Sequence, residues 1–189
     1  MTFRVRGGTD RRADASHREV GAEQSDQFST FVEGAQGGLV RFGFLLLGDV
    51  HRAEDLVQAV LLKVFLRWRR IDEPGAYTRA VMVREATRWR RRRWTGEQPD
   101  ATAGSSVAGV DAIDAADTAE VVHRALLALP IEQRAVLVLR YFEQRSEAEI
   151  AALLGIAGGT VKSRAARGLD ALRAQGCLDD DLRRSPDGT

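Results

Sequence analysis

The sequence is poor in the residues from which metal centres and disulfides are built. It has one cysteine, Cys177, and three histidines that lie far apart, His17, His51 and His123. A lone thiol excludes an internal disulfide, and the histidines do not belong to an HExxH motif or lie near a CxxC motif. We therefore expect no metal and no cofactor.

The motifs of common enzyme classes are also missing. There is no glycine-rich phosphate loop, no nucleophile elbow and no convergent set of histidine and carboxylate side chains. The adjacent acids Glu54 and Asp55 share no site, because neighbours on a helix point about 100° apart. These absences leave little support for a catalytic function.

Long hydrophobic runs are absent as well. The longest apolar run, around residues 42–47, is far too short to cross a bilayer, and the N-terminal stretch is too polar for a signal peptide. We expect a soluble, cytoplasmic protein with no membrane insertion. Nothing alternates with the period of a strand over a useful length, so the expected fold class is all-α.

Charge is segregated along the chain, although the net charge is only +1. The segment 63–94 holds eleven basic residues against three acids, whereas 95–122 holds six acids and no basic residue. The first half of that acidic stretch is rich in Ala, Gly, Ser and Thr, which is typical of a flexible linker. The sequence thus predicts two small helical domains joined by a flexible acidic linker. The expected bounds are a disordered leader 1–25, a basic helical domain 26–95, the linker 96–118, a second helical domain 119–174 and a polar tail 175–189.

Apolar periodicity predicts the helices within these domains. A first helix is expected from Asp26, broken at Gly37 and Gly38, since an interior glycine costs about 1 kcal/mol relative to alanine. The further helices are expected at 39–47, 52–70, 75–94, 119–129 and 131–142.

The stretch from Ser146 to Arg173 has the spacing of a DNA-binding helix-turn-helix. Ser146 and Glu149 form a capping box for the first helix. Ala151 is small where two helices cross, Gly155 supplies the tight turn, and Val161 packs the second helix back on the first. The side chains left outside on the second helix suit phosphates and base edges in a major groove: Thr160, Lys162, Ser163, Arg164 and Arg167. The alternative is an ordinary helical hairpin with a solvated basic face.

A second candidate for nucleic-acid contact is the arginine run between Trp89 and Trp94. Arginines neutralise phosphates with release of counterions, and tryptophan offers a stacking face to unpaired bases. This combination favours a site that holds separated strands. The alternative is that the arginines decorate a helix end and that the tryptophans are core residues, and for Trp68 we favour the core.

Together these stretches resemble the extracytoplasmic-function sigma factors of bacterial RNA polymerase. The resemblance rests on the RAEDLVQ segment from Arg52 to Gln58, the arginine-rich helix 77–94, and the stretch 129–173 with EIAALLG and GTVKSR. It covers most of residues 26–174, with both modules of the family in order and spacing. It implies a non-catalytic alternative sigma factor that binds core polymerase and directs promoter-specific initiation through the −35 and −10 elements, including strand opening.

The resemblance also implies roles for individual residues. Residues 26–95 correspond to the sigma-2 domain, which docks on the clamp coiled coil of the polymerase largest subunit and reads and melts the −10 element. Residues 119–174 correspond to the sigma-4 domain, which binds the flap tip and reads the −35 element through Thr160, Lys162, Ser163, Arg164 and Arg167. An anti-sigma factor is a further partner in this family. The implied polymerase-facing residues are Asp55, Gln58 and Leu62, and the implied −10 residues are Arg84, Arg88, Trp89, Arg91 and Arg92.

One departure from the family affects the expected function. The family usually has asparagine where this chain has Arg84, close to a flipped −10 base, and arginine cannot accept a hydrogen bond. Two alternatives stay open from the sequence: a stand-alone helix-turn-helix regulator that binds duplex DNA as a dimer, and a degenerate sigma-like chain that occupies polymerase without starting transcription.

Overall fold

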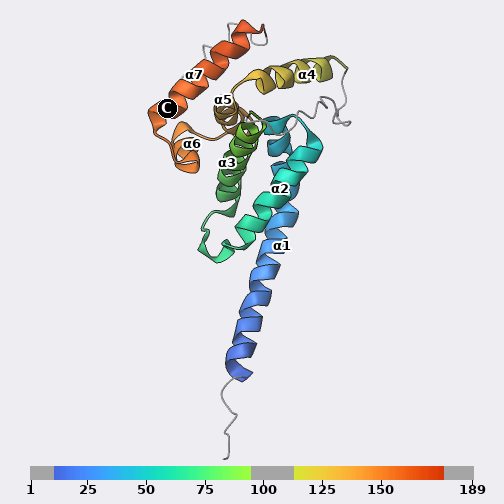
Figure 1. Cartoon of the computed structure of the whole chain (residues 1–189), viewed down its shortest axis with the longest axis vertical. Helices are drawn as coiled ribbons and strands as arrows, with labels where there is room; N and C mark the ends of the chain where they lie inside the picture. Colours follow the sequence, from blue (N-terminus) through green and yellow to red (C-terminus); the bar gives the residue numbers. More distant parts are fainter. Residues whose placement is uncertain (1–10, 95–112, 177–189) are drawn as a thin grey trace, which may run out of the picture.

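The computed structural model describes residues 11–94 and 113–176, and for 11–22, 92–94 and 113–118 it describes the backbone alone. These residues are helical throughout, joined by short turns, which confirms the all-α fold class. Figure 1 shows a long first helix that projects from a body formed by the others. The elements are α1 (Arg11–Leu47), α2 (Val50–Phe65), the 3₁₀ turn η1 (Trp68–Arg70), α3 (Pro74–Trp94), α4 (Ile113–Ala128), α5 (Ile131–Leu137), the π-helical turn η2 (Val138–Phe142), α6 (Glu147–Leu154) and α7 (Gly158–Ala174).

Helix α1 corrects two expectations. It runs without interruption from Arg11 to Leu47, through the expected break at Gly37 and Gly38 and through residues 11–25 of the predicted leader. A β-carbon at Gly37 would meet no atom within 4 Å, so no close contact requires glycine there. The effect of this glycine on the helix is therefore its low helix propensity. The cost is offset by tertiary packing, because Leu39 and Phe42 beyond the glycines are fully buried. Residues 1–10 of the expected leader lie outside the described residues.

Other boundaries shift by a few residues. Helix α2 ends at Phe65 rather than at residue 70, and α4 begins at Ile113, so 113–118 of the expected linker is helical. The expected helix 131–142 is divided into α5 and the π-helical turn η2. Residues 95–112 and 177–189, which hold the rest of the expected linker and nearly all of the tail, lie outside the described residues.

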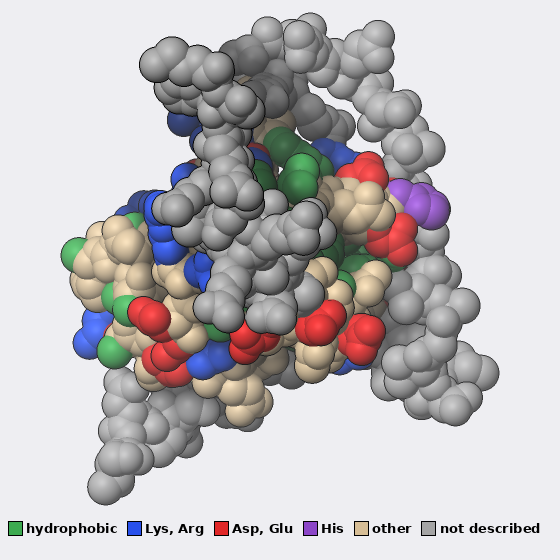
Figure 2. All heavy atoms as spheres, turned by 90° about the horizontal axis from the view of Figure 1, so that it is seen from below, with side chains coloured by type: hydrophobic (Ala, Val, Ile, Leu, Met, Phe, Trp, Pro, Cys, Tyr) green, Lys and Arg blue, Asp and Glu red, His purple; other side chains and the backbone are tan. Residues whose placement is uncertain are grey.

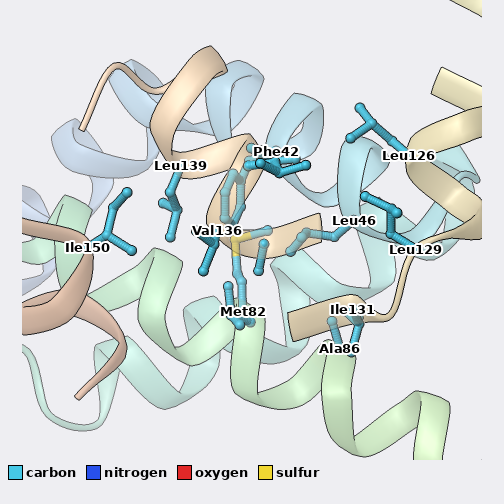
Figure 3. Packing of buried hydrophobic residues seen from close by; sticks show 14 of the residues in the cluster. Phe42, Leu46, Met82, Ala86, Leu126, Leu129, Ile131, Val136, Leu139 and Ile150 are labelled. Carbon is cyan, nitrogen blue, oxygen red and sulfur yellow. The ribbon is translucent and has the colours of Figure 1, made fainter. Parts of the chain in front are cut away.

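The hydrophobic core is continuous between the two halves of the chain. We call α1–α3 the N-terminal module and α4–α7 the C-terminal module. One buried cluster contains Phe42 and Met82 of the first together with Val136 and Ile150 of the second. Figure 3 shows these side chains directed toward one another from α1, α3, α5 and α6. The two modules therefore pack directly against each other.

Trp68 belongs to an aromatic cluster that attaches the N-terminal half of α1. Its ring lies 5.2 Å from the rings of Phe28 and Phe31, and Phe28 also packs edge-on against Phe65. Edge-to-face aromatic pairs of this kind stabilise packing beyond their buried area. The core interpretation of Trp68 is confirmed.

Candidate nucleic-acid interface

The helix-turn-helix forms as its spacing predicts. Ser146 accepts a hydrogen bond from the backbone N–H of Glu149, and the Glu149 carboxylate accepts one from the backbone N–H of Ser146, at 2.8 Å. Gly155 then adopts the left-handed conformation, with φ of 66°, which ends α6 and allows α7 to cross it. The tight turn needs glycine because a β-carbon is strained at this φ.

Packing fixes the direction of α7. Val161 is fully buried in the common core, and Ala151 is partly buried against the same core. Further along, Gly168 lies against α5 so closely that a β-carbon would come 2.9 Å from Leu137 Cδ1. Because these contacts hold one face of α7, the opposite face is presented outward.

The predicted −35 residues lie outside the packed face of α7, and Arg164 among them lines a cavity shared with α3. Lys162 and Arg167 are exposed, whereas Thr160, Ser163 and Arg164 are partly buried. Arg167 is oriented by bonds of 3.2 Å to the backbone carbonyl and to the hydroxyl of Ser163, and Lys162 lies 3.7 Å from Glu147. These weak, exposed partners are readily exchanged for phosphates.

Helix α3 carries the predicted −10 residues. Arg84 is exposed and forms no ion pair with any described residue, and Arg88 pairs with Glu85 at 3.1 Å while its own side chain stays 59% exposed. Arg91 is also exposed. The side chain of Arg92 lies outside the described residues.

Trp89 differs from the other predicted −10 residues because it packs against the hydrophobic core and is only partly accessible. A ring held in this way offers less surface to an unpaired base than an exposed ring does.

The structure brings the two groups of arginines together. Arg84, Arg88 and Arg91 of α3 and Arg164 of α7 line one cavity of about 610 Å³ between the modules, with Glu132 at its wall. Four arginines and one carboxylate line the cavity, and because only Arg88 among these arginines is paired with a further acid, Glu85, in a contact given above, its lining is positive. In Figure 2, by contrast, acidic and basic side chains are interspersed on the part of the described surface that is visible.

Helix α2 presents the predicted polymerase-facing residues on one side. Asp55, Gln58 and Leu62 are all exposed, and their spacing of three and four residues places them in a row. Leu62 is 63% exposed and Leu66, one turn further, is 75% exposed. Leu66 was missed by the sequence analysis; its four-residue offset from Leu62 is the signal that identifies it.

Arg134 was also missed from the sequence. It is only 5% exposed and donates to backbone carbonyls of Leu46, Leu127 and Leu129. No sequence motif marks this role, because the carbonyl of Leu46 lies 88 residues away in the chain and only the fold brings it to Arg134.

Other kinds of site find no support in the part of the chain that the structure describes. Within it, no group of three or more His, Cys, Asp or Glu is placed to hold a metal ion. No helix of this part is long and apolar enough to cross a membrane.

Comparison with known families matches both modules. Residues 31–95 match the family model of sigma-70 region 2, and residues 119–172 match that of sigma-70 region 4.

Relatives extend the match across the chain. The RNA polymerase sigma-E factor of Streptomyces coelicolor is 36% identical over 152 residues, which cover 79% of this chain and 85% of that protein. The ECF RNA polymerase sigma factor SigL of Mycobacterium tuberculosis is 34% identical over 142 residues, covering 71% and 80%.

Among solved structures, the sigma factor RpoE of Bartonella quintana, crystallised with the anti-sigma factor NepR, superposes with a TM-score of 0.64. It is 23% identical, and the match covers 81% of this chain and 98% of that one, which supports the fold. With the two family matches and the relatives above, the chain belongs to the extracytoplasmic-function family of RNA polymerase sigma factors, the non-catalytic subunits that direct polymerase to promoters.

Proposed function

We propose that the two modules divide promoter recognition between them, with α7 reading the −35 element and α3 reading and opening the −10 element. The observation that carries this proposal is the outward basic face of α7, held by buried Val161 and by the left-handed turn at Gly155. A helix held in this way by its partner is the geometry that enters a major groove. Its DNA-facing residues are Thr160, Lys162, Ser163, Arg164 and Arg167.

The proposed −10 surface consists of Arg84, Arg88, Trp89, Arg91 and Arg92. It is supported by the exposure of Arg84, Arg88 and Arg91 on one helix, where their charges attract a phosphate backbone. Because access to the Trp89 ring is limited, we expect the arginines to make most of the contact. Arg84 donates and does not accept, which predicts a −10 base preference different from that of relatives with asparagine there.

The proposed polymerase surface is the row Asp55, Gln58 and Leu62, extended by Leu66. Two exposed leucines separated by one turn and flanked by polar side chains are typical of a protein-binding surface. We assign this row to the clamp coiled coil and the C-terminal module to the flap tip, as the resemblance implies. We propose a cytoplasmic location, since core polymerase and promoter DNA are the proposed partners, and an anti-sigma factor is a further proposed partner.

Two variants test the assignment of the −35 element to α7 and of the −10 element to α3. Arg164→Ala should weaken binding to −35 promoter DNA while leaving the affinity for core polymerase unchanged. Replacing Arg91 and Arg92 by Ala should spare core binding and reduce the permanganate reactivity of −10 thymines. Loss of core binding in Arg164→Ala, or unchanged reactivity in the double variant, would contradict these assignments.

A further inference from the structure

A second cavity, of about 520 Å³, is lined by residues of α1, α2, α3, α4 and α5. It shares no lining residue with the cavity that Arg164 lines beside α7. Three arginines line it, Arg52, Arg90 and Arg134, and no acidic residue is found among the described residues of its wall. A volume of this size fits a small-molecule ligand. The cavity is therefore a candidate binding site separate from the proposed DNA and polymerase surfaces.

Arg134 is a buried charge that lacks a full counter-charge. The residue is 5% exposed, and it donates to the carbonyls of Leu46, Leu127 and Leu129, which carry only partial negative charge. It forms no ion pair with any described residue, and its buried Nε has no hydrogen-bond partner among them. Buried charges in proteins are normally paired. An anion close to Arg134 would supply the missing charge.

The guanidinium of Arg90 lies close to that of Arg134. Both donate to the carbonyl oxygen of Leu129, Arg90 through Nη1 at 3.0 Å and Arg134 through Nη2 at 2.9 Å. Burial, and secondarily the charge of Arg90, lowers the pKa of Arg134 to about 10, so Arg134 is still protonated at neutral pH. Two positive charges that repel each other at the wall of a cavity attract an anion with more than one negative charge.

The charge of this wall favours a polyphosphate over a carboxylate. A guanidinium presents its N–H groups as a planar fork that matches phosphate oxygens, and the contact is charge-assisted. Arg52 and Arg90 are partly exposed, so their side chains are accessible to a ligand in the cavity. The buried Arg134 contributes mainly its charge, since three of its bonds go to carbonyls. Because a chain of phosphates carries several negative charges, it balances more than one arginine.

The rest of the wall is apolar and consists of Leu46, Leu47, Leu127 and Ile131. Leu46 and Ile131 are buried, whereas Leu47 and Leu127 are partly exposed. An inorganic phosphate would leave these leucines in contact with water, whereas a ligand with an aromatic part covers them. Apolar walls joined to a few polar groups are typical of pockets for organic ligands. The wall therefore fits a phosphate ester that carries a nucleobase better than it fits an inorganic anion.

We propose that this cavity binds a nucleoside polyphosphate, whose phosphates contact Arg52 and Arg90. The buried charge of Arg134 lies next to the phosphates, and the base lies on Leu47 and Leu127. This site goes beyond the proposed function and does not rely on it, because none of these residues belongs to the proposed −35, −10 or polymerase-facing sets.

Isothermal titration calorimetry of the full-length protein with three probes tests this site. ATP carries phosphates and a base, pyrophosphate carries phosphates alone, and adenosine carries a base without phosphates. ATP should bind at least about tenfold more tightly than pyrophosphate or adenosine, because only ATP contacts both parts of the wall. An absence of ATP binding, or equal affinities for ATP and pyrophosphate, would overturn the proposal.

Arg90→Gln and its control Arg124→Gln remove the same charge from different places. Arg90→Gln should weaken ATP binding about tenfold, the effect of losing a hydrogen bond between charged groups. Arg124 lies outside the cavity, with its side chain 68% exposed and 3.6 Å from Glu120, so Arg124→Gln should keep the wild-type affinity. Arg52→Gln repeats the test at a second, partly exposed arginine of the wall. Wild-type ATP affinity in both Arg90→Gln and Arg52→Gln would overturn the proposal.

Leu127→Ala distinguishes a contact with the base from a general change in packing. It should weaken ATP binding about three- to tenfold, since apolar area in contact with the base is lost, and it should leave pyrophosphate binding unchanged. A disturbance of the whole cavity would instead weaken ATP and pyrophosphate binding alike, and that result would overturn the assignment of the base to this wall.

Arg164→Gln separates this site from the proposed DNA surfaces, which also attract phosphates. Arg164 lines the other cavity, so the ATP affinity of this variant should equal that of wild type. A loss as large as that of Arg90→Gln would place ATP on the DNA-reading surfaces and overturn the inference. Weaker binding of Arg164→Gln to −35 promoter DNA, with no ATP binding in any form, would overturn the inference and leave the sigma-factor assignment intact.

Discussion

Lys63 of α2 and Glu85 of α3 form an ion pair, with 2.7 Å between Nζ and Oε1. Glu85 is the more buried partner, with 11% of its side chain exposed, and it also accepts a hydrogen bond from Arg88. The pair fixes the helix that carries the proposed polymerase surface against the helix that carries the proposed −10 surface. The pair therefore joins the helices that carry these two proposed surfaces.

Glu85→Gln should lower the free energy of unfolding by about 1–2 kcal/mol, because it leaves Lys63 and Arg88 without the negative charge that they pair with. The effect is limited because Lys63 is partly exposed to solvent. Denaturant unfolding of the full-length protein measures this change. Glu54→Gln is the control, because Glu54 is exposed and its contact with His51 is 3.7 Å long. Equal stability of the two variants would show that the Lys63–Glu85 pair does not hold α2 and α3 together.

The capping box of α6 makes the stability of the fold depend on pH in the acidic range. Hydrogen bonds from the Ser146 backbone and hydroxyl, and then from Arg145, lower the pKa of Glu149 from 4.5 to about 2. A carboxylate with a lowered pKa stabilises the fold above pH 4.5, and this contribution disappears as the pH falls toward 2. Glu149→Gln should thus be less stable than wild type at pH 7 and equal to it near pH 2. A stability difference that is the same at both pH values would rule out the charged cap.

His123 makes the contact between the modules sensitive to mild acid. Burial lowers the pKa of His123 below 6.5. The hydrogen bond with the Phe44 backbone and the charge of Glu120 raise the pKa by less than burial lowers it, and the charge of Arg134 lowers it further. Because the unfolded chain takes up the proton first, the contribution of neutral His123 is present above pH 6.5 and is lost as the pH falls.

Unfolding midpoints at pH 7.5 and 5.5 measure this effect. Wild type should lose more stability over this interval than His123→Phe, which keeps a ring against Phe44 and cannot be protonated. An equal loss in the two proteins would mean that His123 does not titrate within the folded interface.

The exposed leucines of α2 should be required for polymerase binding. Leu62→Glu combined with Leu66→Glu is expected to weaken the affinity for core polymerase about five- to thirtyfold, the effect of losing about 1–2 kcal/mol from an apolar contact. Unfolding should be unaffected, because both side chains are exposed. Val121→Glu on α4 is the matched control, since Val121 is 43% exposed on a different surface. Equal affinities for the control and the double variant would move the polymerase surface elsewhere.

The sequence was a good guide where structure is decided locally. The capping box at Ser146 and the left-handed turn at Gly155 depend on residues within one or two turns, so the helix-turn-helix was predicted with its bounds nearly correct. The row on α2 was implied by the family resemblance, and its role in polymerase binding stays a prediction. Leu66 was missed because an exposed leucine is ordinary on its own and becomes a surface only beside Leu62.

Long-range packing decided the features that the sequence analysis missed. The continuity of α1 through Gly37 and Gly38 depends on burial of Leu39 and Phe42 against other helices, which no local propensity reports. Arg134 looks like one more helix arginine until α1 and α4 bring their terminal carbonyls to it. The packing of the modules on each other was hidden for the same reason, since it depends on contacts between distant segments.

Run-off transcription tests the central claim most directly. Core polymerase is assayed with and without this protein on a library of genomic promoter fragments, and the Arg91 and Arg92 to Ala variant serves as the control for strand opening. The account predicts new, protein-dependent start sites that share −35 and −10 elements at a fixed spacing. The variant should fail to open the DNA at these sites. Co-elution with core polymerase without any transcript would contradict it and would identify a sigma-like chain that occupies polymerase without initiating.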